Sequence, residues 1–167
     1  MGQDQDDYGP TEAEILLHQA ISSGNLELVK KRYFKSSDEA YLIGLAASKG
    51  YTKIIKWLVF EAGCNYLNDM NMMFAAANGQ LEALKLLKNL GCKWYRNSCI
   101  NIAMTGTLET FVWSIENGCP LYINSCILNS TNPDILKYLH EKFGVTKCPK
   151  FDFCKFCKKL DVVIDMF

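Results

Sequence analysis

Apolar residues recur along this chain every three or four positions, with charged residues between them. The pattern is clearest from residue 81 to residue 88, where Leu84 and Leu87 alternate with Glu82, Lys85 and Lys88. This spacing predicts an amphipathic helix that buries one face. A second apolar run, rich in alanine, ends just before Gly79. We therefore expect two helices joined by a short turn.

The same two-helix unit occurs six times. The turn position is glycine in four units and degenerates in the last two: Gly24, Gly50, Gly79, Gly106, Thr131 and Lys158. The steps between these positions are 26, 29, 27, 25 and 27 residues. The position five residues further on is always apolar: Val29, Ile55, Leu84, Phe111, Leu136 and Val163. A period of this length predicts an all-α solenoid in which each unit packs on its neighbours.

The residues that end and begin the helices can also be predicted. Glycine in the turn predicts a left-handed backbone at each first-helix end, and a second set of glycines is expected to end the second helices: Gly63, Gly91, Gly118 and Gly144. In the fifth unit, Asn132 can cap a helix and Pro133 suits its first turn. We expect Asn71, Asn97 and Asn124 to cap first helices.

The chain resembles the ankyrin-repeat family. The resemblance rests on the Ala-Ala-x-x-Gly-x-Leu-Glu-x-Leu-Lys-x-Leu pattern at 75–87 and on Gly91-Cys92 after it. The Cys-Pro and Cys-Lys-Trp endings are similar to diverged repeats of large DNA viruses of amoebae and of some protists. The usual Thr-Pro-Leu-His opening is missing, and each unit lacks several residues of the family's usual β-hairpin. The resemblance implies an ankyrin-like solenoid with shortened or absent β-hairpin fingers.

The repeats predict the following organisation. Residues 1–10 form a disordered acidic lead-in, and residues 11–167 form one repeat domain. The six units cover 11–38, 39–68, 69–96, 97–123, 124–150 and 151–167. The first unit is expected to be the N-terminal cap, with a second helix that continues through Lys35.

Composition excludes several classes of function. The 18 basic residues balance the 18 acidic ones, so nothing favours nucleic-acid binding. No apolar run approaches the ~20 residues of a membrane span. The N-terminus lacks the basic and apolar regions of a signal peptide. We expect a cytoplasmic protein, or one of the host-cell cytoplasm or virion if the source is viral.

Seven of the eight cysteines follow the repeats rather than a disulfide or metal pattern, and Cys157 is the additional one. Cys64, Cys92, Cys119 and Cys148 hold one position, and Cys99, Cys126 and Cys154 are assigned to another. We expect reduced thiols that fill buried sites as small apolar side chains. The alternative is a zinc site formed by His140, Cys148, Cys154 and Cys157, which include one C-x-x-C pair. Because a strong zinc signature needs two such pairs, core cysteines are favoured, with His140 on a polar helix face.

No catalytic motif is recognisable. His18 and His140, the two histidines, lie about four repeats apart and cannot share a site. The family resemblance implies a non-catalytic scaffold that binds another protein through its concave face, with no cofactor, small-molecule substrate, nucleic acid or membrane.

Candidate partner-binding residues lie in the loops between repeats and at the C-terminus. They are Tyr66, Trp94, Tyr95, Arg96, Tyr122 and Phe167. Tyrosine, tryptophan and arginine dominate interface hot spots, although Trp94 is also the best suited to cover the helices beneath it. Two alternatives stay open. One is a subunit of a larger assembly, such as a virion, docked through its apolar C-terminal repeat. The other is a ubiquitin-ligase substrate adaptor, which is disfavoured because neither terminus has room for an F-box.

Overall fold

The computed structural model describes residues 9–35 and 38–144 of the 167-residue chain. This part contains ten helices in five consecutive pairs. Their bounds are α1 Glu12–Ser22, α2 Leu26–Arg32, α3 Glu39–Ser48, α4 Thr52–Phe60, α5 Asp69–Ala77, α6 Leu81–Asn89, α7 Ser98–Thr105, α8 Leu108–Glu116, α9 Ile123–Asn129 and α10 Pro133–Phe143. The predicted sixth unit, Phe167 and the lead-in up to residue 8 lie outside the described residues.

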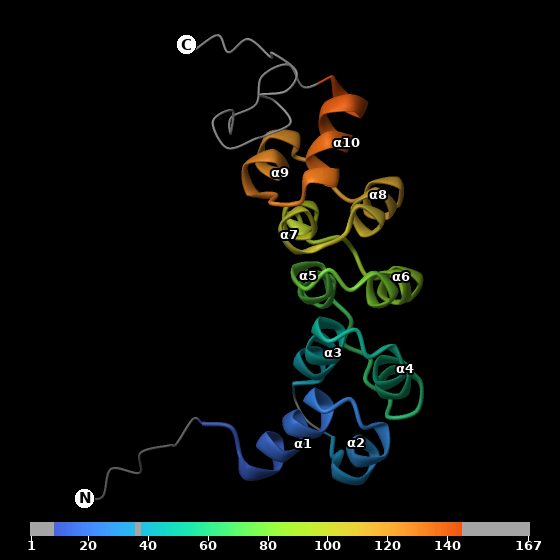
Figure 1. The fold of residues 1–167 in the computed structure, drawn as a ribbon. Helices are drawn as coiled ribbons and strands as arrows, with labels where there is room; N and C mark the ends of the chain where they lie inside the picture. Colours follow the sequence, from blue (N-terminus) through green and yellow to red (C-terminus); the bar gives the residue numbers. More distant parts are fainter. Residues whose placement is uncertain (1–8, 36–37, 145–167) are drawn as a thin grey trace, which may run out of the picture.

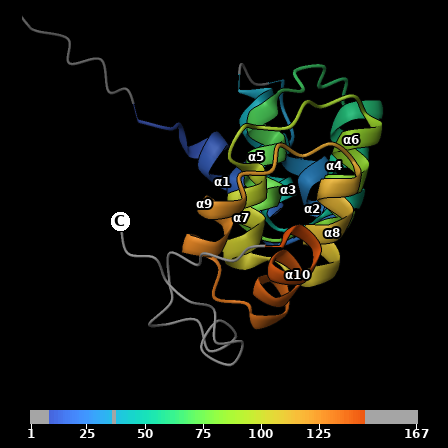
Figure 2. The ribbon, with the colours of Figure 1, turned by 90° about the horizontal axis from the view of Figure 1, so that it is seen from above.

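The helices form two parallel layers (Figure 1). The odd layer consists of α1, α3, α5, α7 and α9, each packed on the next, and the even layer consists of α2, α4, α6, α8 and α10. Seen along the stack, the two layers stay separate over the whole array (Figure 2). Residues 9–35 and 38–144 contain no strand. The predicted all-α ankyrin-like solenoid without hairpin fingers is therefore confirmed for this part of the chain.

Small residues bring the odd helices close together. Ala46 and Ala47 in α3 and Ala75 and Ala76 in α5 are fully buried. A Cβ added to Gly44 would lie only 2.6 Å from the ring of Phe74 in α5. Helices approach most closely where side chains are smallest. The alanine-rich runs before each turn thus determine the tight packing of the odd layer.

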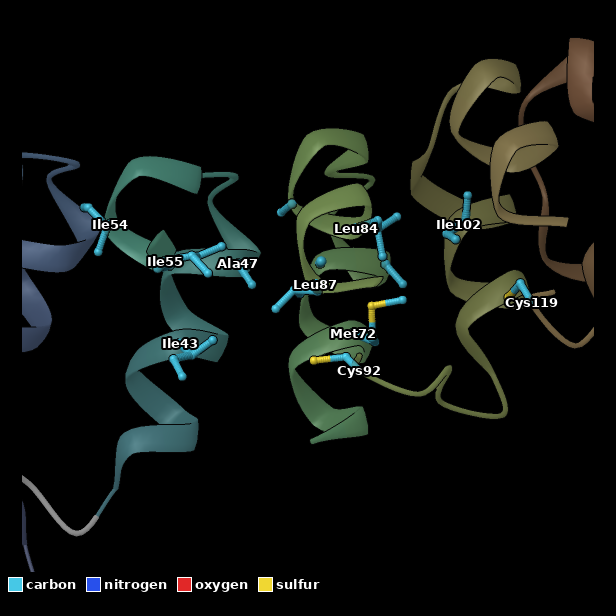
Figure 3. Close-up of a cluster of buried hydrophobic side chains, with 14 of the residues drawn as sticks. Ile43, Ala47, Ile54, Ile55, Met72, Leu84, Leu87, Cys92, Ile102 and Cys119 are labelled. Atoms are coloured by element: carbon cyan, nitrogen blue, oxygen red, sulfur yellow. The ribbon is translucent and has the colours of Figure 1, made fainter. Parts of the chain in front are cut away.

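The core runs between the layers as one continuous cluster (Figure 3). The apolar position five residues after the turn is fully buried in the first four pairs: Val29, Ile55, Leu84 and Phe111. In α10 the residue at this position, Leu136, is half-buried, and its neighbour Ile135 is fully buried instead. Burial along the second helices otherwise follows the sequence prediction.

Three of the four turn glycines adopt the predicted left-handed backbone, at Gly24, Gly50 and Gly79. Gly106 does not, because its φ of −86° and ψ of 171° are extended. A Cβ at Gly106 would lie 2.7 Å from the carbonyl oxygen of Ile102, so glycine is required there by close approach. The next residue, Thr107, caps α8 through its side chain. All four glycines predicted to end second helices have positive φ.

The predicted caps of the first helices are only partly correct. Asn68, not Asn71, caps α5, because Asn71 lies one turn in and closes a capping box with the Asn68 amide at 3.0 Å. Asn71 also donates to the carbonyl of Ala40 in α3 at 2.7 Å, which joins two repeats. Asn97 precedes α7 without a side-chain cap bond, and Asn124 lies inside α9. Asn132 and Pro133 begin α10 as predicted.

The first unit differs from its prediction at the end of α2. This helix stops at Arg32 instead of continuing to Lys35, and Tyr33 is extended, with ψ 135°. The Tyr33 ring packs edge-on against Trp57 of α4 at 5.3 Å. Its hydroxyl lies 3.5 Å from the Cys64 sulfur. Continuing the helix would remove these contacts with the second repeat.

Candidate protein-interaction surface

The loop residues predicted to bind a partner differ in exposure. Tyr66 is 66% and Tyr122 49% exposed, and Arg96 is also exposed. Tyr95 and Trp94 are half-buried. The five residues come from three successive loops, before α5, α7 and α9, and so lie along one edge of the array. Phe167 falls outside the described residues.

Trp94 is a packing residue in this fold. Its indole N–H donates to the carbonyl of Asn117, the residue that ends α8, at 2.8 Å. Its ring lies 6.1 Å from that of Trp113, and the Lys88 ammonium lies 5.8 Å from its ring centre. Because the indole satisfies a carbonyl that a helix end leaves unpaired, Trp94 joins the third repeat to the fourth. Trp94 therefore has less exposed surface available to a partner than Tyr66 or Tyr122 has.

The sequence analysis missed the exposed apolar residues of the odd helices. They are Ile15, Tyr41 and Met70 in the first turns of α1, α3 and α5, and Met104 and Leu128 near the ends of α7 and α9, each 41–48% exposed. We call this set, with the half-buried Leu45 and Phe74, the odd-helix face. Ile15, Tyr41 and Met70 each stand nine residues before a turn glycine, and Leu45 and Phe74 stand five before. Residues four apart share one side of a helix, so the register alone could have revealed this face.

Charge is distributed unequally between the two layers. The odd helices contain four charged residues and no lysine or arginine: Glu12, Glu14, Glu39 and Asp69. Every even helix carries at least two charged residues, and α2 and α10 carry four each. In α2 and α6 the charges pair along the helix, Glu27 with Lys30 at 3.1 Å and Glu82 with Lys85 at 2.7 Å. The even layer is therefore a solvated surface with many charges, whereas the odd layer carries few charges, all of them acidic.

The five described cysteines are all buried and reduced. The amides of Cys92 and Cys119 donate to the carbonyls of Leu87 and Ser114 at 3.0 Å, directly after a left-handed glycine. This bond pattern closes a helix end and turns the next side chain inward. Cys99 and Cys126 are also buried but do not hold equivalent positions, since they are the second residue of α7 and the fourth of α9.

Burial suppresses the reactivity of these thiols. It raises the pKa of Cys92 to about 11. A hydrogen bond with Cys119, together with burial, raises the pKa of Cys99 to about 12. A hydrogen bond with Cys99, together with burial, also raises the pKa of Cys126. Because the thiolate is the nucleophile and the metal ligand, neutral buried thiols act as core side chains, as the sequence predicts.

The raised thiol pKa values predict a loss of stability at high pH. In the unfolded chain these thiols ionise near their ordinary pKa, whereas in the folded chain Cys92 and Cys99 stay protonated to about 11 and 12. Unfolding therefore releases protons, and the free energy of unfolding falls as pH rises from about 9 to 11. The expected slope is about 1.4 kcal/mol per pH unit for each thiol. Urea unfolding at several pH values measures it, and Cys92→Ala should flatten the slope.

The predicted zinc ligands are not brought together within the described residues. His140 is 6% exposed, which corrects its predicted place on a polar helix face, since it lies beside the buried Leu139 in α10. Cys148, Cys154 and Cys157 lie outside the described residues. Between residues 9 and 144, masked positions aside, no group of three potential metal ligands converges.

The comparison with protein families agrees with this geometry. The family described as ankyrin repeats (three copies) matches residues 17–98, which run from within α1 to the start of α7. This segment is similar to ankyrin repeats. Further along, α7 to α10 continue the stack with the same helix pairing. No curated protein matches the chain.

Ankyrin repeats are protein-interaction scaffolds and are typically non-catalytic. The match concerns the family alone, so the resemblance to viral repeats stays a prediction. None of the ten described helices is long and apolar enough to cross a membrane.

Proposed function

We propose that this ankyrin array is a non-catalytic scaffold that binds a partner protein through the odd-helix face and the loops beside it. The observation that carries the proposal is the contrast between the layers. Each of the five odd helices carries an exposed apolar side chain, and none of these helices contains a lysine or arginine. Contiguous apolar patches on a protein surface mark interaction sites.

The two layers differ in what a partner would have to desolvate. Protein interfaces are enriched in Tyr and Met and depleted in Lys and Glu, which is the contrast between the odd-helix face and the even layer. Burial of the odd-helix face stabilises a complex by about 25 cal/mol for each Å² of apolar surface removed from water. Covering the even layer would desolvate Glu27, Glu82 and their lysine partners. The odd-helix face is therefore the more favourable surface to cover.

The loops extend this surface. Tyr66 lies in the loop four residues before Met70, and Tyr122 directly precedes α9. Methionine adapts to the shape of a partner, and tyrosine adds a rigid ring with a polar tip. Tyr66, Tyr122 and Arg96 therefore stay candidate contacts. Tyr95 is a weaker candidate because it is half-buried. Trp94 is left out because it packs against Trp113.

Site-specific photocrosslinking tests the proposal. Benzoylphenylalanine replaces Met104 on the odd-helix face, Tyr66 in a loop, or Phe60 at the end of α4 in the even layer. Phe60 is the matched control because it is apolar and 67% exposed. In the native cell, discrete adducts are expected from Met104 and Tyr66 and none from Phe60. Adducts from Phe60 alone would overturn the assignment of the face.

Assembly subunit and ubiquitin-ligase adaptor remain the two finer interpretations. Both use a protein-binding surface, and the apolar C-terminal residue proposed for docking, Phe167, lies outside the described residues. Stoichiometry separates them, because a subunit is recovered in a fixed ratio to its partner and an adaptor is not. A cytoplasmic location likewise stays a prediction.

A further inference from the structure

We propose that the odd-helix face takes a basic amphipathic segment of a partner protein, seated over the first turns of α1, α3 and α5. This inference rests on the proposed function and specifies the chemistry of the partner. The segment presents apolar side chains to Ile15, Tyr41 and Met70 and places lysine or arginine beside the neighbouring carboxylates.

Each of these three first turns combines an exposed apolar side chain with a carboxylate. Glu12 and Glu14 precede Ile15 in α1. Glu39 lies two residues before Tyr41 in α3, and Asp69 directly precedes Met70 in α5. The stacked repeats hold these pairs side by side along one edge of the odd layer. The first turns of α7 and α9 carry no acidic residue, so the feature is confined to the first three repeats.

A role at the helix dipole does not explain this arrangement fully. A carboxylate in a first turn is favourable in any helix, and four of the five even helices have one as well: Glu27, Glu82, Glu109 and Asp134. In α2 and α6, however, a lysine three residues later neutralises it. The corresponding positions after Glu12, Glu39 and Asp69 hold Ile15, Leu42 and Met72. Within the described residues no lysine or arginine forms an ion pair with the odd-helix carboxylates.

Two of the four carboxylates accept hydrogen bonds, and the other two are exposed. Hydrogen bonds from the Thr11 amide and hydroxyl, at 2.8 and 2.9 Å, hold the pKa of Glu14 below its ordinary value. Glu39 accepts a bond from the Asn65 amide at 3.0 Å. Glu12 and Asp69 are exposed. An ionised carboxylate beside an apolar side chain selects a cationic, apolar partner and disfavours an acidic one.

The charge along the loops also indicates where the basic part of the segment lies. The exposed Lys93 and Arg96 lie in the loop that leads to α7. In the loop before α3, Lys35 and Asp38 offset each other in formal charge. The edge thus changes from negative at α1 to α5 to positive at the approach to α7. The basic part of the segment therefore lies over the first three repeats.

Binding of designed peptides to the full chain tests the inference. Three labelled 18-residue helical peptides are compared by fluorescence anisotropy: an amphipathic Leu–Lys peptide, a Leu–Glu peptide of the same pattern, and a Gln–Lys peptide of the same charge. The Leu–Lys peptide is expected to bind at least about tenfold more tightly than the other two. Equal affinity of the Leu–Glu peptide would overturn the charge requirement. Equal affinity of the Gln–Lys peptide would overturn the apolar one.

Charge-neutralising variants then locate the site. Glu12→Gln with Asp69→Asn removes two first-turn carboxylates of odd helices, and Glu109→Gln with Asp134→Asn removes two from even helices. Both doubles lose the same helix-dipole interactions, so they are matched in stability. The odd pair is expected to weaken Leu–Lys binding about fivefold and the even pair less than about twofold. Equal effects of the two pairs would overturn the placement.

Failure of this inference is distinguishable from failure of the proposed function. Tyr41→Ser with Met70→Ser removes apolar surface from the odd-helix face without changing its charge. If this variant abolishes the Met104 photocrosslink while the Glu12 and Asp69 variant leaves it intact, the scaffold function stands and the basic segment is wrong. If neither variant affects the photocrosslink, the partner contacts α7 without using the first turns of α3 and α5, and the placement of the segment is wrong. Absence of adducts from both Met104 and Tyr66 in the otherwise unchanged chain would instead show that the proposed function is wrong.

Discussion

Replacing Phe111 with alanine is expected to lower the free energy of unfolding by about 3–5 kcal/mol. Phe111 is fully buried in α8, and its ring meets Tyr138 of α10 edge-on, with 6.3 Å between the centroids. The truncation loses the transfer free energy of the ring and leaves a cavity between the fourth and fifth repeats. In a stacked array this also weakens the coupling of neighbouring repeats.

Phe143→Ala is the matched control for this substitution. Phe143 also meets Tyr138 edge-on, at 6.2 Å, but it lies at the surface with 36% of its area exposed. The Phe143→Ala substitution should lower the free energy of unfolding by about 1 kcal/mol, because this partly exposed ring buries less apolar surface than Phe111 does. Urea unfolding followed by circular dichroism gives both values. A cost at Phe111 no greater than that at Phe143 would contradict the buried position of Phe111.

Gly79→Ala is expected to cost about 2–4 kcal/mol. Part of this is the left-handed backbone, since φ is +63° and a Cβ there costs about 1–2 kcal/mol. The rest is steric. The added Cβ would lie 3.0 Å from both the Cα of Gly106 and the carbonyl oxygen of Thr105. Because these atoms belong to the backbone of the next repeat, relief requires two repeats to move apart.

Gly91→Ala separates the two contributions. Its φ of +88° imposes a similar backbone cost, but a Cβ there meets no atom within 4 Å. We expect a loss of about 1 kcal/mol at Gly91. Thermal and urea unfolding of both variants measure the difference. Equal losses would show that the contact between Gly79 and the Thr105–Gly106 backbone does not constrain the stack.

The sequence predicts most of the fold because the repeats encode it locally. The helix pairs, the buried position after each turn and the left-handed glycines at Gly24, Gly50 and Gly79 follow from residues close in the chain. The errors occur where a neighbouring repeat decides the local structure. Asn71 is drawn into a bond with Ala40 of α3, and Tyr33 leaves its helix to pack on Trp57. A single unit does not contain that information.

The candidate surface was predicted less well for a related reason. Loop aromatics are conspicuous in the sequence, and Tyr66 and Tyr122 are indeed exposed, but Trp94 satisfies a carbonyl of another repeat. The sequence analysis did not separate buried from exposed positions among the apolar residues before the turns. Met70 and Met72 look alike in sequence, yet Met70 is 41% exposed and Met72 is fully buried. Comparing equivalent positions across repeats would have separated them, because the nine-before position recurs in three units.

The small residues of the odd layer make each helix pair a wedge. Alanine and glycine bring α3 and α5 together at the thin end, while longer side chains such as Lys56 and Lys85 line an open groove between α4 and α6 at the thick end. Figure 1 shows the array bowed with the even layer outside. The total angle through which the array curves therefore grows with the number of repeats. Exchanging Ala75 or Ala76 for larger residues would flatten that arc, and the diameter of the body that fits inside it would increase.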